Sequence, residues 1–190
     1  YSYPNVNNKD FPEKPCSLEM ILPDGSTAFA TTAGIKAHGN ASRAPEKNPK
    51  HGFGLKFSGD FGPTALEYQL FPDSPATKHD DLVLRADFGV SWRHWSDSPN
   101  GAGSYQRTRA SRFRDAWMKH AQRDLGGVAG HTRYCHLFMN GLYWGTYDFS
   151  EQSLGQFAEN YFAASTNGYD IYEQGIMKTS AGGNATAYTA

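Results

Sequence analysis

The sequence has almost no net charge and no long apolar run, and both absences restrict the partners the protein can have. Its 190 residues include 18 Lys and Arg and 19 Asp and Glu, giving a formal net charge of −1. No bulk electrostatic field therefore draws the chain onto nucleic acid or anionic lipid. No apolar stretch approaches the roughly 20 residues needed to span a bilayer. We expect no nucleic-acid partner and no direct membrane insertion, so any anion site must be local.

Cysteine is scarce, and the two that are present do not form a metal-binding pattern. Cys16 and Cys135 lie far apart in the sequence, and neither has further ligands at the spacing of a zinc site. This argues against zinc. The pair is compatible with one disulfide in an oxidising compartment or with two buried free thiols, and the sequence leaves both alternatives open.

Aliphatic and charged residues are also few, and the residues that replace them indicate the fold class. Hydrophobic residues make up 38% and charged residues 19%, while Gly contributes 20 residues and Pro 10. This balance favours a loop-rich α+β protein over a helical bundle. Aromatic residues, at 14%, supply bulk for the core. The length fits one domain, preceded by a polar extended arm at residues 1–12.

The first half of the chain has the alternation of β-strands. Ser17–Leu22 and Thr27–Ile35 flank the turn signal Pro23-Asp24-Gly25, which predicts a hairpin. His51–Phe57 alternates between apolar and small or polar residues, as in a half-buried strand. Asp81–Ala86 is compact and apolar, which indicates a buried strand.

The second half combines helical and hairpin signals. The spacing predicts a helix over 106–125, ending before a glycine pair. Its apolar stripe consists of Ala110, Phe113, Trp117, His120 and Ala121. Asn140-Gly141 between the strands His131–Met139 and Tyr143–Phe149 is the strongest short hairpin signal. Ser153–Phe162 follows as a second helix.

Several segments have the order and spacing of one known family. They are 34–43 (GIKAHGNASR), 49–57 (PKHGFGLKF), 114–115 (RD) with 123–126 (RDLG), and 136–147 (HLFMNGLYWGTY). No single segment is diagnostic, but in this order they resemble the spore-coat CotH kinase family, over about residues 13–173. The resemblance implies an atypical protein-kinase-like fold for a single domain, 13–190, with antiparallel N-terminal strands, a central helix and an Asn-Gly hairpin.

The same resemblance implies an activity and a setting. CotH-like modules transfer phosphate from a magnesium-bound nucleotide, here ATP with Mg²⁺, to Ser or Thr of surface or coat proteins. We therefore expect an extracellular or cell-surface location and a surface or coat protein as substrate. We also expect the domain to be truncated at its C-terminus, as part of a larger parent chain.

Phosphoryl transfer requires cations on the nucleotide phosphates, and the resemblance implies where they lie. Asn40 and Ser42 form a bend whose backbone N–H groups can face an anion, with Arg43 beside it. Lys50 and Lys56 flank the strand that follows, as a nucleotide-clamping lysine would. These five residues are the predicted nucleotide site.

Carboxylates are the second requirement, for metal binding and for accepting a proton. Glu151 follows the Asn-Gly hairpin and Asp148 lies close by, so we predict both as catalytic residues. Asp170 is the predicted metal ligand. The hypothesis requires that Arg43 and Glu151 converge on one shared cleft.

One departure from the family pattern supports an alternative function. Leu154 occupies the position at which kinase members of the family usually carry Asp, and leucine can neither bind a metal nor accept a proton. The alternative is therefore a catalytically inactive, pseudokinase-like surface or assembly module. A third alternative is a sugar-binding protein that uses the tryptophan-rich segment 87–104.

Overall fold

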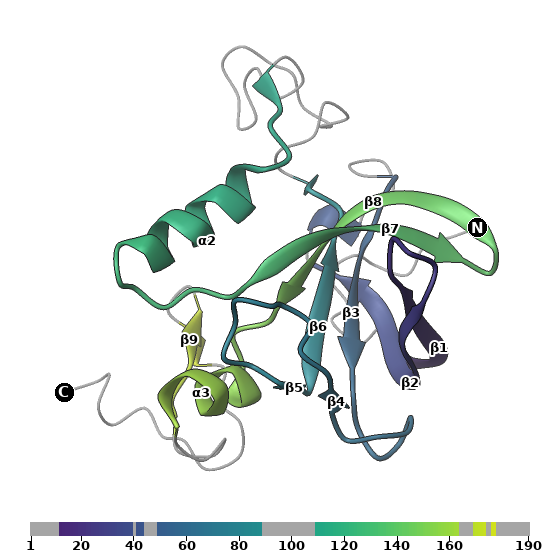
Figure 1. Cartoon of the computed structure of the whole chain (residues 1–190), viewed down its shortest axis with the longest axis horizontal. Coiled ribbons are helices and arrows are strands. Elements are labelled where there is room, and N and C mark those ends of the chain that lie inside the picture. Colours follow the sequence, from purple (N-terminus) through teal and green to yellow (C-terminus); the bar gives the residue numbers. More distant parts are fainter. Residues whose placement is uncertain are drawn as a thin grey trace.

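A six-stranded antiparallel sheet forms the centre of the protein (Figure 1). The computed structural model describes residues 12–39, 41–43, 49–88, 109–163, 169–173 and 176–177. Across the sheet, the strands follow the order β1 (Lys14–Ile21), β2 (Thr27–His38), β3 (Gly52–Lys56), β6 (Asp81–Arg85), β8 (Leu142–Glu151) and β7 (Thr132–Met139).

Two helices and several short elements accompany the sheet. They are η1 (Ala41–Arg43), α2 (Arg114–Asp124), α3 (Gly155–Phe162), β4 (Leu66–Glu67) with β5 (Lys78–His79), and β9 (Tyr172–Glu173) with β10 (Ile176–Met177). Within the described part of the chain, no helix is long and apolar enough to cross a membrane. The predicted α+β class is confirmed.

The Asn-Gly hairpin forms as predicted, because its two central residues take the backbone angles that the turn needs. Asn140 has a φ of 50° and Gly141 a φ of 79°, the paired positive values of a type I′ turn. The ladder shifts register between Leu137 and Phe138, where Trp144 is the extra residue of a β-bulge in β8. This hairpin extends β7 and β8 beyond the rest of the sheet (Figure 1).

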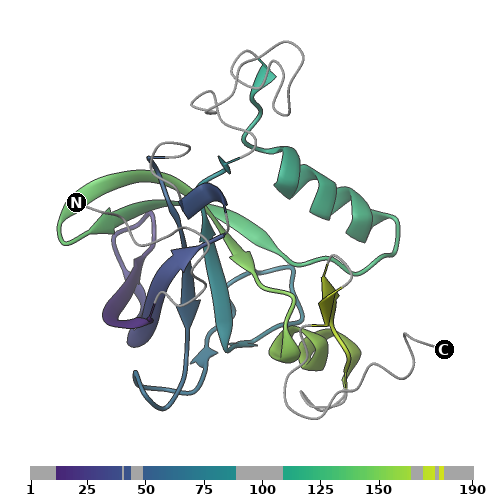
Figure 2. The ribbon, with the colours of Figure 1, turned by 180° about the vertical axis from the view of Figure 1, so that it is seen from behind.

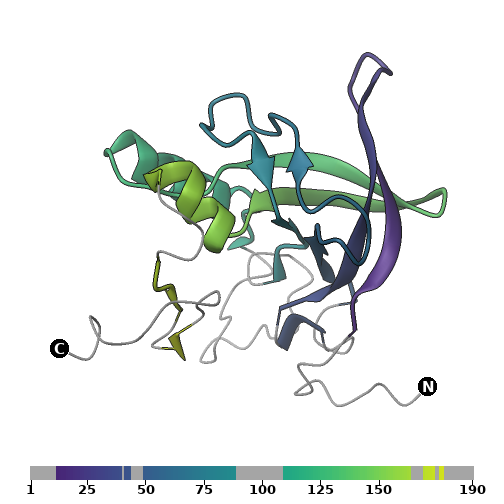
Figure 3. The ribbon, with the colours of Figure 1, turned by 90° about the horizontal axis from the view of Figure 1, so that it is seen from below.

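One face of the sheet carries the hydrophobic core. The chain segment between β3 and β6, which includes β4 and β5, covers this face (Figure 3). The buried core side chains are Ala33, Leu55, Phe57, Leu66, Leu70, Phe71, Leu82, Leu84, Ala86, Tyr147 and Phe149. Since successive strand residues point to opposite faces, the polar residues between them lie on the other face.

Helix α2 packs differently from an ordinary amphipathic helix. The predicted apolar stripe faces solvent, with Phe113 63% and Trp117 59% exposed, and no residue of α2 is buried. The helix instead contacts the sheet through Asp115, whose carboxylate lies 3.6 Å from Arg85 of β6. The physical reason is that the facing side of the sheet is charged, so a polar helix face complements it. Helix α2 and the β1–β2 hairpin lie at opposite flanks of the molecule (Figure 2).

Both cysteines are free thiols, which corresponds to the second of the two predicted alternatives. Cys16 of β1 and Cys135 of β7 are partly buried and pack against the core. Burial raises the pKa of both thiols, that of Cys135 to about 11. The thiolate is the reactive form, so neither side chain is suited to nucleophilic chemistry near neutral pH.

Candidate functional site

Charged side chains gather on the polar face of the sheet where β6 and β8 run side by side. Asp148 of β8 pairs directly with Arg85 of β6 and with Tyr134 of β7. Residues directly opposite each other in a ladder share a face, so these three side chains lie together. Helix α2 lies on the same face, and its contacts with the sheet build the candidate site.

The Asp115 carboxylate of α2 lies between two cations. Its Oδ2 atom is 3.6 Å from Arg85 Nε and 3.0 Å from Lys119 Nζ, one helical turn further along α2. Lys119 Nζ also donates a hydrogen bond of 3.3 Å to Ser150 Oγ of β8. Strand β6 and helix α2 are therefore joined by an ion pair on the polar face of the sheet.

Asp148 is the buried carboxyl of this site, only 1% exposed. Its Oδ1 atom accepts no hydrogen bond from the residues that the structure describes. Burial raises the pKa of Asp148 to about 6, because water is lost from the charged form; Lys119 and Arg85 oppose this rise, and Asp87 adds to it. A carboxyl group that titrates near neutral pH is typical of a functional site.

Asp87 adds a second buried carboxylate, directly after β6. Its φ of 57° lies in the left-handed region, which few residues other than Gly adopt. Arg112 Nε and Nη2 each lie 2.9 Å from Asp87 Oδ2, and Nη2 also donates a 2.7 Å hydrogen bond to the Thr146 carbonyl. The ion pair holds the chain after β6 against the middle of β8.

Lys50 reaches the same carbonyl from the start of β3. Its ammonium group donates a hydrogen bond to the Thr146 carbonyl and lies 4.3 Å from the centre of the Tyr147 ring. Burial, together with the neighbouring Arg112, lowers the pKa of Lys50 to about 8, and Asp87 opposes this shift. Lys50 thus belongs with the carboxylates at the end of β6.

We call these residues the charged cluster. It comprises Lys50, Arg85, Asp87, Arg112, Asp115, Lys119 and Asp148. With four cations and three carboxylates, the cluster has an excess of positive charge when every carboxylate is ionised. An excess of positive charge is one requirement of a phosphate site.

The structure places the predicted bend at the same end of the sheet as the charged cluster. Ser42 and Arg43 lie in η1, directly after β2. The Ser42 carbonyl lies 3.1 Å from Nδ1 of His51, the residue that follows Lys50. Asn40 is outside the described residues. Three predicted nucleotide contacts, Ser42, Arg43 and Lys50, thus share one end of the sheet.

Two predicted site residues, Lys56 and Asp170, lie away from the charged cluster. Lys56 pairs with Asp81 at the opposite end of β3, and it is exposed. Asp170 is exposed and follows α3. The structure does not bring either residue to the charged cluster.

Glu151 lies on the core side of β8, three residues after Asp148, and belongs to a separate buried network. Its Oε2 atom accepts hydrogen bonds of 2.7 Å from the His131 backbone N–H and 2.6 Å from the Tyr161 hydroxyl. Ser74 Oγ is 3.5 Å from Glu151 Oε1. The structure therefore does not bring Glu151 to the charged cluster. Arg43 follows the end of β2, whereas Glu151 pairs with Leu82 at the start of β6, so the predicted convergence of Arg43 and Glu151 on one cleft was wrong.

The Glu151 network joins three parts of the chain. His131 Nδ1 lies 2.6 Å from the Tyr161 hydroxyl of α3, and His79 of β5 lies 3.9 Å from the Glu151 carboxylate. Burial lowers the pKa of His79 and raises that of Tyr161, so both are neutral at pH 7. These contacts attach α3 and the segment before β5 to the end of β8, which is a structural role.

Sequence reasoning missed several members of the cluster. Arg85 directly follows the apolar run Leu82–Leu84. A charged residue at the end of a buried strand was the one sequence feature that could have marked Arg85 as a site residue. No comparable sequence feature marked Arg112 or Lys119, because the residues they contact on the sheet come from distant parts of the sequence. Their roles follow only from the way α2 lies on the sheet.

Among the described residues, the carboxylates of the cluster do not form a metal site. In the part of the chain that the structure describes, no three His, Cys, Asp or Glu side chains are placed to hold a metal ion. The carboxylates of Asp87 and Asp115 already contact Arg112 and Lys119, whereas Mg²⁺ needs free oxygen ligands. We therefore assign no metal ligand among the described residues.

A scan against protein-family models finds no match, and a search of curated proteins finds no significant similarity. Function is therefore inferred from the charged cluster itself.

Proposed function

We propose that the domain binds nucleotide phosphates at the charged cluster, as a CotH-like, protein-kinase-like module acting at the cell surface or outside the cell. The observation that carries this proposal is the Arg85–Asp115 contact between β6 and α2. Protein kinases use a lysine on a strand, paired with a glutamate on the helix that follows, to position the nucleotide phosphates. Here Arg85 would take the place of the lysine and Asp115 that of the glutamate.

The chemistry of the cluster supports this assignment. An arginine side chain offers a planar fork of donors that matches phosphate oxygens, and both Arg85 and Arg112 already contact carboxylates. Bound ATP would supply the transferable phosphoryl group, and these side chains would orient it and neutralise its charge. Asp148, with a pKa of about 6, is the group best suited to accept the proton of a Ser or Thr hydroxyl near neutral pH.

An inactive module that keeps the nucleotide site is the second candidate. Leu154 is the N-cap of α3, so the position expected to hold an acidic residue offers no ligand. The described residues also lack a metal-binding group. This candidate would retain the fold for assembly with a surface or coat protein.

Calorimetric titration with ATP, with and without Mg²⁺, tests the nucleotide site. We expect the wild-type protein to bind ATP and Arg85→Ala to bind at least about tenfold more weakly, a loss of about 1.4 kcal/mol. Lys14→Ala is the matched control, because Lys14 is an exposed cation on the edge strand β1. Absence of binding at millimolar ATP in the wild type would exclude the proposal.

A phosphate-transfer assay separates the two candidates once binding is established. Radiolabelled ATP with a generic Ser/Thr acceptor such as casein should label the acceptor if the module is an active kinase. Activity in the wild type would exclude the inactive module. Activity that appears only in Leu154→Asp would instead support the inactive module as the native state.

A further inference from the structure

Helix α2 presents its apolar side to solvent. Its outward-facing large side chains and those that flank it are Phe113 (63% exposed), Trp117 (59%), Met118 (56%) and Leu125 (89%). The inward side instead carries Asp115 and Lys119, which contact the sheet. A surface helix normally shows the reverse arrangement, and a contiguous exposed apolar patch marks an interaction surface.

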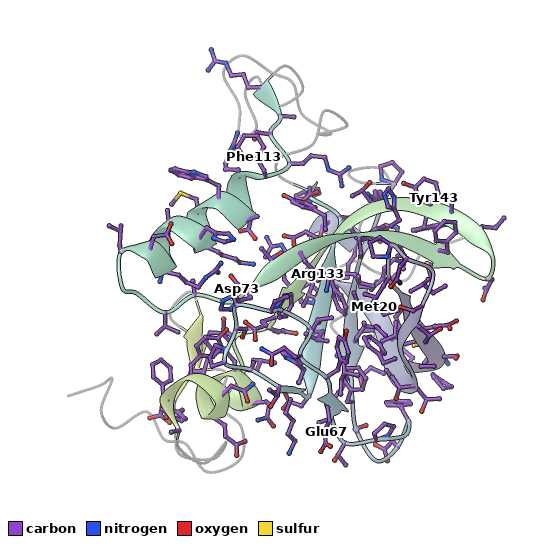
Figure 4. All side chains as sticks on the ribbon, in the orientation of Figure 1. Met20, Glu67, Asp73, Phe113, Arg133 and Tyr143 are labelled. Carbon is purple, nitrogen blue, oxygen red and sulfur yellow. The ribbon has the colours of Figure 1, made fainter. Side chains whose placement is uncertain are left out.

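Three of these exposed residues and the partly buried Ala121 follow a single stripe. Phe113, Trp117, Ala121 and Leu125 recur at intervals of four residues, which places them along one side of the helix. Phe113 lies at the start of α2, outside the sheet (Figure 4). The stripe thus runs the full length of the helix, and we call it the outer stripe.

Two opposite charges lie at the ends of the outer stripe. Arg114 is exposed in the first turn of α2, and Asp124 is exposed in the last turn. If two copies of the helix lie antiparallel, Arg114 of each copy can face Asp124 of the other. A parallel arrangement would place Arg114 against Arg114, and the repulsion between them would oppose it.

The register that pairs these charges also matches the shapes along the stripe. With Arg114 opposite Asp124, Trp117 of one copy lies opposite Ala121 of the other, and Phe113 lies opposite Leu125. At the two central pairs a large side chain then meets a small one, so the helices can approach to the usual 8–10 Å. Charge and volume therefore select the same arrangement.

We infer that the outer stripe is the interface of a homodimer, in which two copies of α2 pack antiparallel across a two-fold axis. Trp117 is the central anchor, since buried tryptophan contributes large binding energies at interfaces. The end charges set the orientation more than the affinity. This interface uses the outward side of α2, so it does not depend on the proposed nucleotide site.

Sedimentation equilibrium over a range of protein concentrations tests the dimer. We expect the mass of the wild type to rise from the monomer value of 21.0 kDa towards twice that value with increasing concentration. Trp117→Lys should remain monomeric over the same range. Ile21→Lys is the matched control, since Ile21 is an equally exposed apolar residue on β1, and it should dimerise like the wild type.

Charge exchange tests the antiparallel orientation. Arg114→Asp and Asp124→Arg should each weaken self-association at least severalfold, because each places like charges together at both ends. An equal mixture of the two variants should form a heterodimer, since every end pair is then Asp opposite Arg. Far-ultraviolet circular dichroism verifies that the variants are folded. A wild type that stays monomeric, a Trp117→Lys protein that dimerises normally, or a mixture that fails to associate would each overturn the proposal.

Discussion

Replacing Glu151 with alanine is expected to lower the free energy of unfolding by about 3–5 kcal/mol, because it removes one member of a buried polar network. The Glu151 carboxylate accepts hydrogen bonds from the His131 backbone and the Tyr161 hydroxyl. Without it, the buried His131 N–H has no acceptor, and the Tyr161 hydroxyl keeps only its contacts with His131 Nδ1 and Ser74 Oγ. The lost hydrogen bonds and this desolvation carry the cost. The loss should also loosen α3, which carries Tyr161.

Urea denaturation at pH 7 measures this effect. Glu67→Ala, at an exposed glutamate of β4, should change the stability by less than about 0.5 kcal/mol. Tyr161→Phe should cost about 1–2 kcal/mol. It removes the hydroxyl that contacts Glu151, His131 Nδ1 and Ser74 Oγ but leaves the carboxylate with its backbone partner. If Glu151→Ala and Glu67→Ala have equal effects, the network does not contribute to stability.

Lowering the pH from 7 to 5 is expected to stabilise the fold through Asp148. The pKa of this carboxyl is about 6 in the folded protein, above its ordinary value of 3.8. As the pH falls, the folded state therefore takes up a proton at a higher pH than the unfolded state does. The stabilising contribution is fully present below about pH 4 and is lost as the pH rises through 6. Its total size is on the order of 3 kcal/mol.

Unfolding curves of Asp148→Asn at a series of pH values isolate this contribution. Asparagine cannot titrate, so the stability difference between the variant and the wild type should change by about 2 kcal/mol between pH 7 and pH 4. Burial also raises the pKa of Asp81 to about 6, so the variant keeps part of the pH dependence. Asp60→Asn, at an exposed loop residue, should follow the wild type. A stability difference that does not vary with pH would contradict the buried position of Asp148.

These two carboxylates show why only part of the candidate site could be predicted. Glu151 and Asp148 are three residues apart on one strand, so alternation alone places them on opposite faces. The sequence does not say which face carries the core. The structure assigns the core side to Glu151, where it serves stability, and the charged side to Asp148, where it joins Arg85.

Features that depend on neighbouring residues follow from the sequence alone. The Asn140-Gly141 turn forms because those two residues tolerate positive φ, and the strands around it follow from alternating side chains. The way in which distant segments meet is seen only in the folded protein. Arg85 and Asp115 are brought together by the packing of α2 on the sheet, and the charge of that sheet face turns the apolar side of the helix outward. Such contacts depend on the free energy of the whole folded chain, and no local sequence pattern encodes them.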